Sequence, residues 1–134
     1  MRTPSISLAA AAAMLAAATL AAPAARADSP PPERSCFLST QWEGWSAPGN
    51  SNVLLLRVNI SDIYRVELAP GTRVYKGADR FLVNQVRGSS WICSPLDLDL
   101  TLSDTLGFHQ PLFPISMRKL SKAEVAALPR KDRP

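Results

Sequence analysis

This chain has few histidines and cysteines, and its net charge is small. Its 134 residues include one histidine, two cysteines, 15 basic and 11 acidic residues. A single histidine restricts nucleophilic catalysis, because a serine or cysteine nucleophile needs a basic partner within hydrogen-bond reach. A zinc site needs three or four cysteine, histidine or carboxylate ligands, so the supply is poor. The small charge excess argues against nucleic acid as a partner.

Long hydrophobic runs are absent after residue 27, and residues 1–27 have the order of a signal peptide. A basic residue precedes an uncharged, alanine-rich run from Leu8 to Ala22, and Ala25-Arg26-Ala27 follows. Small residues at −3 and −1 suit signal peptidase, which predicts cleavage before Asp28. The run is shorter than a membrane-spanning helix requires. We therefore predict an exported bacterial protein, periplasmic or secreted, with no membrane span.

Removal of the leader leaves 107 residues, enough for one domain with a modest core. Residues 28–34 contain Pro30-Pro31-Pro32, which fixes an extended backbone and removes hydrogen-bond donors. We expect residues 28–34 to be a disordered, Pro-rich lead-in. We expect a single domain at residues 35–129 that ends in a short helix, followed by a frayed basic tail at residues 130–134.

Cys36 and Cys93 are the two cysteines. In an exported domain a single pair predicts one intramolecular disulfide. The alternative is a catalytic thiol, which would need His109 as its partner. We interpret His109 instead as a surface or turn residue.

Short apolar or alternating segments separated by turn formers predict β-strands in most of the domain. The predicted strands cover residues 36–42, 53–58, 63–68, 81–86, 91–93, 96–103 and 112–117, with turn formers at 43–50. They predict a mainly β fold: one small antiparallel β domain of about six or seven strands, rolled into a barrel-like shape or a sandwich, with a short C-terminal helix.

The clearest alternation is at residues 96–103, where Leu96, Leu98, Leu100 and Leu102 alternate with polar residues. A helix would scatter these leucines, so the period predicts a half-buried strand with all four pointing inward. Pro111 directly before the last predicted strand and Pro114 within it suit an edge position.

The hydrophobic period changes after residue 120. Ser121 and Glu124 have the spacing of a capping box, and Leu120 and Val125 the spacing of a hydrophobic staple. Pro129 cannot continue a helix, so we predict a helix over residues 122–128. Two turns are too short to be stable alone, which predicts that the helix docks on the sheet.

Asp97 and Asp99 share one face of the predicted strand, with Asp104 nearby. They suggest a calcium site or a pair of acid–base carboxylates. A calcium loop needs irregular backbone, however, and the alternating leucines predict a straight strand. We therefore interpret these carboxylates as a solvated outer face and predict no metal site, no cofactor and no catalytic residue.

Two groups of residues are candidates for binding. Trp42 and Trp45 flank a glycine and could stack on a sugar or on a partner's aromatic ring, although such residues also close small β cores. Arg130, Lys131 and Arg133 make the C-terminal end basic and could contact an anionic envelope component or an acidic protein. A basic end can also serve solubility alone.

Four segments resemble a family of small uncharacterised proteobacterial exported envelope proteins, which share a domain of unknown function. They are Arg34-Ser35-Cys36-Phe37, residues 63–68, Ser90-Trp91-Ile92-Cys93 and residues 117–129. The resemblance covers nearly the whole mature chain. It implies export, but no activity, cofactor or catalytic residue.

That family's pattern has a second cysteine pair, near the positions held here by Gly71-Thr72 and Leu112-Phe113. Both of its members are absent from this sequence. Joint loss is expected if those two cysteines bridge each other. The resemblance therefore implies a Cys36–Cys93 bond in this chain, and a looser tie between the segments around Pro70 and Pro114.

The residues favour a non-enzymatic, disulfide-stabilised periplasmic domain that binds a protein or another envelope component. Two alternatives stay open. One is a small enzyme or metal-dependent factor that uses the face of Asp97 and Asp99. The other is a structural or stress-related envelope protein without a discrete ligand.

Overall fold

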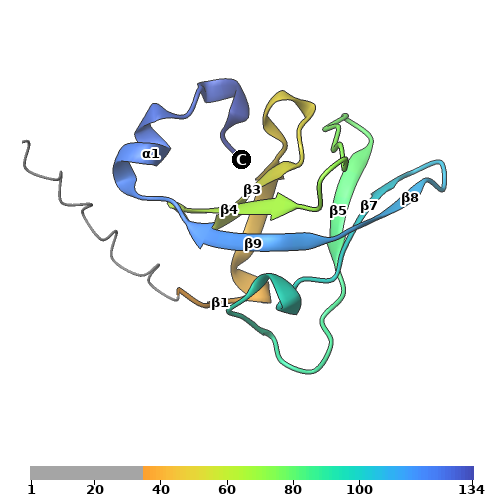
Figure 1. Cartoon of the computed structure of the whole chain (residues 1–134), viewed down its shortest axis with the longest axis horizontal. Helices are drawn as coiled ribbons and strands as arrows, with labels where there is room; N and C mark the ends of the chain where they lie inside the picture. The colour runs from red at the N-terminus through yellow and green to blue at the C-terminus, as the bar shows by residue number, and fades with distance from the viewer. Residues whose placement is uncertain (1–34) are drawn as a thin grey trace, which may run out of the picture.

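The computed structural model describes residues 35–134, so the predicted signal peptide and Pro-rich lead-in lie outside the described residues. The described chain folds into strands joined by short turns, with its one α-helix close to the C-terminus (Figure 1). The elements are β1 (Phe37–Leu38), η1 (Ser39–Gln41), β2 (Trp42–Ser46), η2 (Pro48–Asn50), β3 (Val53–Val58), β4 (Asp62–Leu68), β5 (Arg80–Asn84), β6 (Trp91–Ile92), η3 (Pro95–Asp97), β7 (Leu100–Asp104), β8 (His109–Leu112), β9 (Pro114–Lys119), α1 (Lys122–Ala127) and η4 (Arg130–Asp132), where η marks a 3-10 helix.

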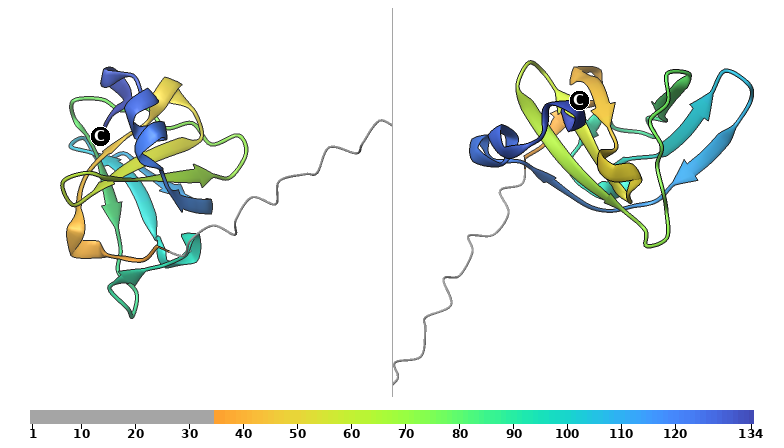
Figure 2. Two further views of the ribbon diagram at one scale, coloured as in Figure 1. Left: turned by 90° about the vertical axis from the view of Figure 1, so that its left-hand side faces the viewer. Right: turned by 90° about the horizontal axis from the view of Figure 1, so that it is seen from above.

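The strands form three antiparallel sheets, with the orders β2-β3-β4-β9, β5-β7-β8 and β1-β6. Phe113 alone separates β8 from β9, so one chain segment runs from the edge of one large sheet to the edge of the other. The β7–β8 hairpin extends away from the rest of the domain (Figures 1 and 2). The predicted small antiparallel β domain with a C-terminal helix is confirmed, but it has nine strands within residues 35–134, rather than six or seven, and its sheets do not close.

The main core joins all three sheets. Its buried side chains come from alternate positions of the larger sheets and from the two-stranded sheet, as the period of a strand requires. They include Leu54, Leu56, Val58, Tyr64, Val66, Leu68, Leu100, Leu102, Leu112, Phe37 and Ile92. Phe37 lies opposite Ile92 in the pairing of β1 with β6. The Cys36–Cys93 disulfide lies beside this pair, and both of its cysteines are exposed.

Helix α1 covers the opposite face of the four-stranded sheet (Figure 2). Leu55 of β3 and Ile63 of β4 point to this side and pack with Leu120, Val125 and Leu128. The capping box is confirmed, because the Ser121 hydroxyl accepts from the Glu124 N–H at 3.2 Å and the Ser121 N–H donates to the Glu124 carboxylate at 2.8 Å. The helix ends one residue earlier than predicted, since Leu128 is extended.

The alternating leucines are only half explained by a strand. Leu100 and Leu102 lie in β7 and Leu98 is buried just before it, but Leu96 is 91% exposed. The reason is η3, which begins at Pro95 and turns the chain before the strand starts. The prediction of one straight strand over residues 96–103 is therefore wrong for residues 96–99, and Leu96 does not point inward.

The segment around Cys36–Ser46 also differs from the prediction. The expected strand over residues 36–42 is interrupted by η1, and β2 continues through residues expected to form a turn. A register shift between Trp42 and Gly44 marks a bulge in the pairing of β2 with β3. Gly44 therefore lies at an irregular position within a strand rather than in a turn.

The C-terminal tail is ordered rather than frayed. Residues 130–132 form η4, and the Ser46 hydroxyl donates to the Asp132 carbonyl. The Arg133 guanidinium donates to the carbonyls of Ala126 and Leu128 at 3.0 and 3.1 Å. It thereby satisfies acceptors at the end of α1 that have no partner within the helix.

Candidate functional site: the cleft between β2 and β5

The two large sheets leave a cleft between one edge strand of each, β2 and β5. Its volume is about 470 Å³, within the range of ligand-binding pockets. We call it the β2–β5 cleft. The lining residues are Ser39, Thr40, Trp42, Glu43, Gly44 and Trp45 on one side and Phe81, Leu82, Asn84 and Val86 on the other.

The structure places both candidate tryptophans in this cleft. Trp42 and Trp45 are half-buried and pack against the main core. The Trp42 indole N–H donates to the Gly44 carbonyl at 2.8 Å. The Lys76 ammonium lies 5.5 Å from the centre of the Trp45 ring. Both indoles are thus fixed in place before any ligand binds, which lowers the entropic cost of binding.

Leu82 and Val86 add apolar surface to the other side of the cleft, which Phe81 also lines although strand alternation directs its side chain to the other face of β5. Phe81 is 45% exposed and Val86 is 49% exposed. The sequence predicts a strand over both residues, but no role in binding for either. No local signal could have found them, because they lie about 40 residues from Trp42 and Trp45 and meet them only through the packing of the two sheets.

The outer edge of β5 has unpaired backbone groups. The Gln85 N–H donates to the Asp99 carbonyl at 2.9 Å, so this pair is hydrogen-bonded across the sheet. Opposite residues in an antiparallel ladder alternate between bonded and non-bonded pairs. Val83 is therefore bonded to β7, whereas the N–H and C=O of Leu82 and Asn84 point away from β7. Both Leu82 and Asn84 line the cleft.

The alternation of hydrogen-bonded and non-bonded residue pairs also explains why β8 can contain Pro111. The Asp104 N–H donates to the Phe108 carbonyl, so the pair of Thr101 with Pro111 is a non-bonded one. Proline has no N–H to donate, and such a position on an edge strand tolerates it. The predicted edge position is confirmed, since β8 and β9 each end a sheet, but the single strand expected over residues 112–117 is two strands that meet at Phe113.

The facing edge of β2 is partly occupied. The Trp42 N–H donates to the Ser39 carbonyl within η1. The Trp45 carbonyl accepts from the Lys76 ammonium at 2.7 Å. Two backbone groups of β2 thus have partners other than a strand, and the more open edge of the cleft is that of β5.

The basic candidates do not join the tryptophans in the cleft. Arg133 is bonded to the end of α1, while Arg130 and Lys131 are exposed beside it. The tail reaches β2 from the side of α1, through Ser46. The two groups of candidate binding residues are therefore separate features of the surface.

Asp97 and Asp99 do not form a shared carboxylate face. Asp97 lies in η3, and its carboxylate accepts the N–H groups of Cys93 and Ser94 at 2.9 and 2.8 Å. These bonds, that of Cys93 first, lower the pKa of Asp97. Asp99 forms an ion pair with Arg87. Across residues 35–134, no cluster of three or more metal-binding side chains occurs.

His109 lies in β8 opposite Ser103 of β7. Its Nδ1 is 2.9 Å from the Ser103 hydroxyl, a distance that would suit a nucleophile and its base. Ser103, however, is only 2% exposed. A substrate cannot reach this hydroxyl in the folded domain, so the contact serves as a cross-strand hydrogen bond.

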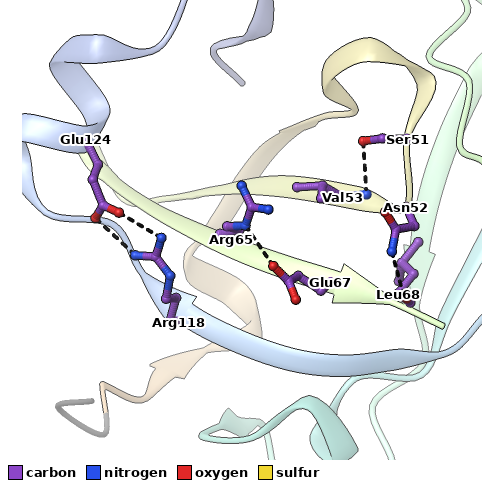
Figure 3. Close-up of polar contacts among 8 residues, drawn as sticks. All are labelled: Ser51, Asn52, Val53, Arg65, Glu67, Leu68, Arg118 and Glu124. Atoms are coloured by element: carbon purple, nitrogen blue, oxygen red, sulfur yellow. Dashed lines mark hydrogen bonds and ion pairs between the residues drawn. The ribbon is translucent and has the colours of Figure 1, made fainter. Parts of the chain in front are cut away.

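A second polar cluster lies where α1 meets the four-stranded sheet, and it has a structural role (Figure 3). Arg118 makes two hydrogen bonds to the Glu124 carboxylate, at 2.7 and 3.0 Å, and Arg65 makes one to Glu67 at 3.1 Å. Arg118 and the Ser121 N–H lower the pKa of Glu124 to about 2. The carboxylates offset the repulsion between Arg65 and Arg118, which lie opposite each other.

Comparison with models of protein families, with curated proteins and with solved structures found no match to this chain. The resemblance to the envelope family therefore stays a prediction. Within residues 35–134, no helix has the length and apolar character needed to cross a membrane.

Proposed function

We propose that this protein is an exported, non-enzymatic domain that binds a protein or envelope component in the β2–β5 cleft. One observation carries the proposal: Trp42 and Trp45, both packed against the main core, line an open cleft together with Leu82 and Val86. Apolar and aromatic linings with a few polar groups are typical of binding sites. The Cys36–Cys93 disulfide supports export, because such bonds persist in oxidising compartments.

Site-specific photo-crosslinking tests the binding role. A photoreactive phenylalanine analogue is placed at Val86, which lines the cleft, in the full-length chain expressed in its native cell. Ile115 is the matched control, since it is 55% exposed and does not line the cleft. We expect a discrete covalent adduct from Val86 and none from Ile115. Equal adducts, or none from Val86, would contradict the proposed site.

Mass spectrometry of the protein purified from the same cells tests export. We expect a mature chain that begins at Asp28 and carries the Cys36–Cys93 disulfide. A full-length, reduced chain would contradict the proposed location without bearing on the cleft.

A further inference from the structure

We infer that the ligand of the β2–β5 cleft is an extended polypeptide segment of a partner protein, which adds to β5 as a new strand. The inference rests on the proposed function and names the class of its ligand. Its basis is the row of unpaired backbone groups at Leu82 and Asn84, on the edge that faces the two tryptophans.

The spacing of these groups matches a peptide backbone. Leu82 and Asn84 are two residues apart on one strand, so their outward N–H and C=O groups repeat every ~7 Å. An extended chain offers acceptors and donors at the same repeat. A sugar or a lipid headgroup has no such repeat. The N–H and C=O groups of Leu82 and Asn84 have no hydrogen-bond partner within the described part of the chain.

The other edges of the two large sheets are less suited to strand addition. The edge of β8 contains Pro111, which lacks an N–H at an outward-facing position. The edge of β9 begins with Pro114 and is packed against η3. On β2, Lys76 and η1 already occupy backbone groups. The edge of β5 therefore combines free donors, free acceptors and an apolar floor.

The side chains of the cleft define the partner segment further. Alternate residues of an added strand point to the same face, here toward Trp42, Trp45 and Leu82. The partner segment should therefore have apolar residues at every second position. The chain's own lead-in suits this edge poorly, because Pro30-Pro31-Pro32 has no N–H to donate to the carbonyls of β5.

The test uses peptides selected from a random decapeptide pool on the mature, disulfide-bonded protein. A selected peptide is then made in two forms, with backbone N-methyl groups at its odd or at its even residues. A strand that pairs through one side must lose affinity in one form only, by about tenfold per lost hydrogen bond. Side chains are identical in both forms, so each form is the control of the other.

Amide hydrogen exchange of the protein locates the bound peptide. We expect exchange at Leu82 and Asn84 to slow about tenfold on peptide binding, with Val83 unchanged because its N–H already bonds to β7. Val86→Lys should weaken binding and Ile115→Lys should not. A second copy of this chain is tested by adding unlabelled protein instead of peptide.

The inference would be overturned if no peptide binds, if both N-methylated forms bind equally, or if protection appears on β8 rather than β5. Protection by a second copy alone would also overturn it in favour of self-association. The proposed function is judged separately. If the Val86 crosslink succeeds while strand pairing fails, the cleft binds a ligand by its side chains alone.

Discussion

Loss of the Cys36–Cys93 disulfide should lower the free energy of unfolding by about 4 kcal/mol. The bond joins residues 57 apart in the sequence. In the chain-entropy model, opening a loop of that length increases the freedom of the unfolded chain by an amount worth about 4 kcal/mol. Both cysteines are exposed, so Cys36→Ala and Cys93→Ala should leave the core around Phe37 and Ile92 packed.

Urea unfolding of the mature protein measures this loss. With a dependence on urea of about 1–3 kcal/mol per molar, the midpoint should fall by about 1.3–4 M. Each single variant, the double variant and the reduced wild type should unfold alike, because each lacks the same bond. A loss under about 1 kcal/mol would contradict the chain-entropy estimate, and unequal single variants would indicate another role for one of the cysteines.

Three further predictions concern residues outside the cleft. Leu102→Ala should lower the free energy of unfolding by about 2–5 kcal/mol because Leu102 is fully buried, whereas Leu96→Ala should change it by less than about 0.5 kcal/mol; equal losses in urea unfolding would place both leucines in the core. The folded-state pKa of Glu124 is lowered to about 2, so its stabilisation should be complete well above its ordinary pKa and lost as the pH falls toward 2; urea midpoints of wild type and Glu124→Gln should differ at pH 6 and converge near pH 2, and a constant difference would contradict the ion pair. Arg133→Ala should cost about 0.3–1 kcal/mol by freeing carbonyls at the end of α1, and thermal unfolding of Arg130→Ala, with no loss, is the control.

The sequence predicts a strand or helix with the correct bounds where only one local pattern is present. The strand at 53–58 is predicted to the residue, and that at 63–68 to within one, because each has apolar positions that face a core and ends at turn formers. The start of α1 is set by its own capping box, which no tertiary contact overrides.

Competing local signals explain the errors. At Leu96 the leucine period predicts a strand, yet Pro95 begins a 3-10 turn in which the Asp97 carboxylate accepts the N–H of Ser94. At Gly44 the glycine suggests a turn, but the chain absorbs it as a bulge in β2. At each place two local patterns favour different structures. The backbone hydrogen bonds of the folded chain fit the structure that the sequence-based prediction did not choose.

The candidate site was half predictable. Trp42 and Trp45 are conspicuous in the sequence, as aromatic residues often are at binding surfaces. The opposite wall depends on which strands end the two sheets, and on which backbone groups of β5 face outward. Those properties come from register and packing between distant segments, which local patterns do not encode.

The decisive experiment for the β2–β5 cleft is the crosslink from Val86, with Ile115 as its control. It asks whether the β2–β5 cleft, rather than the surface in general, contacts a partner in the cell. We expect one discrete adduct from Val86 and none from Ile115. An intact, folded Val86 variant that yields no adduct would contradict a binding role for the cleft.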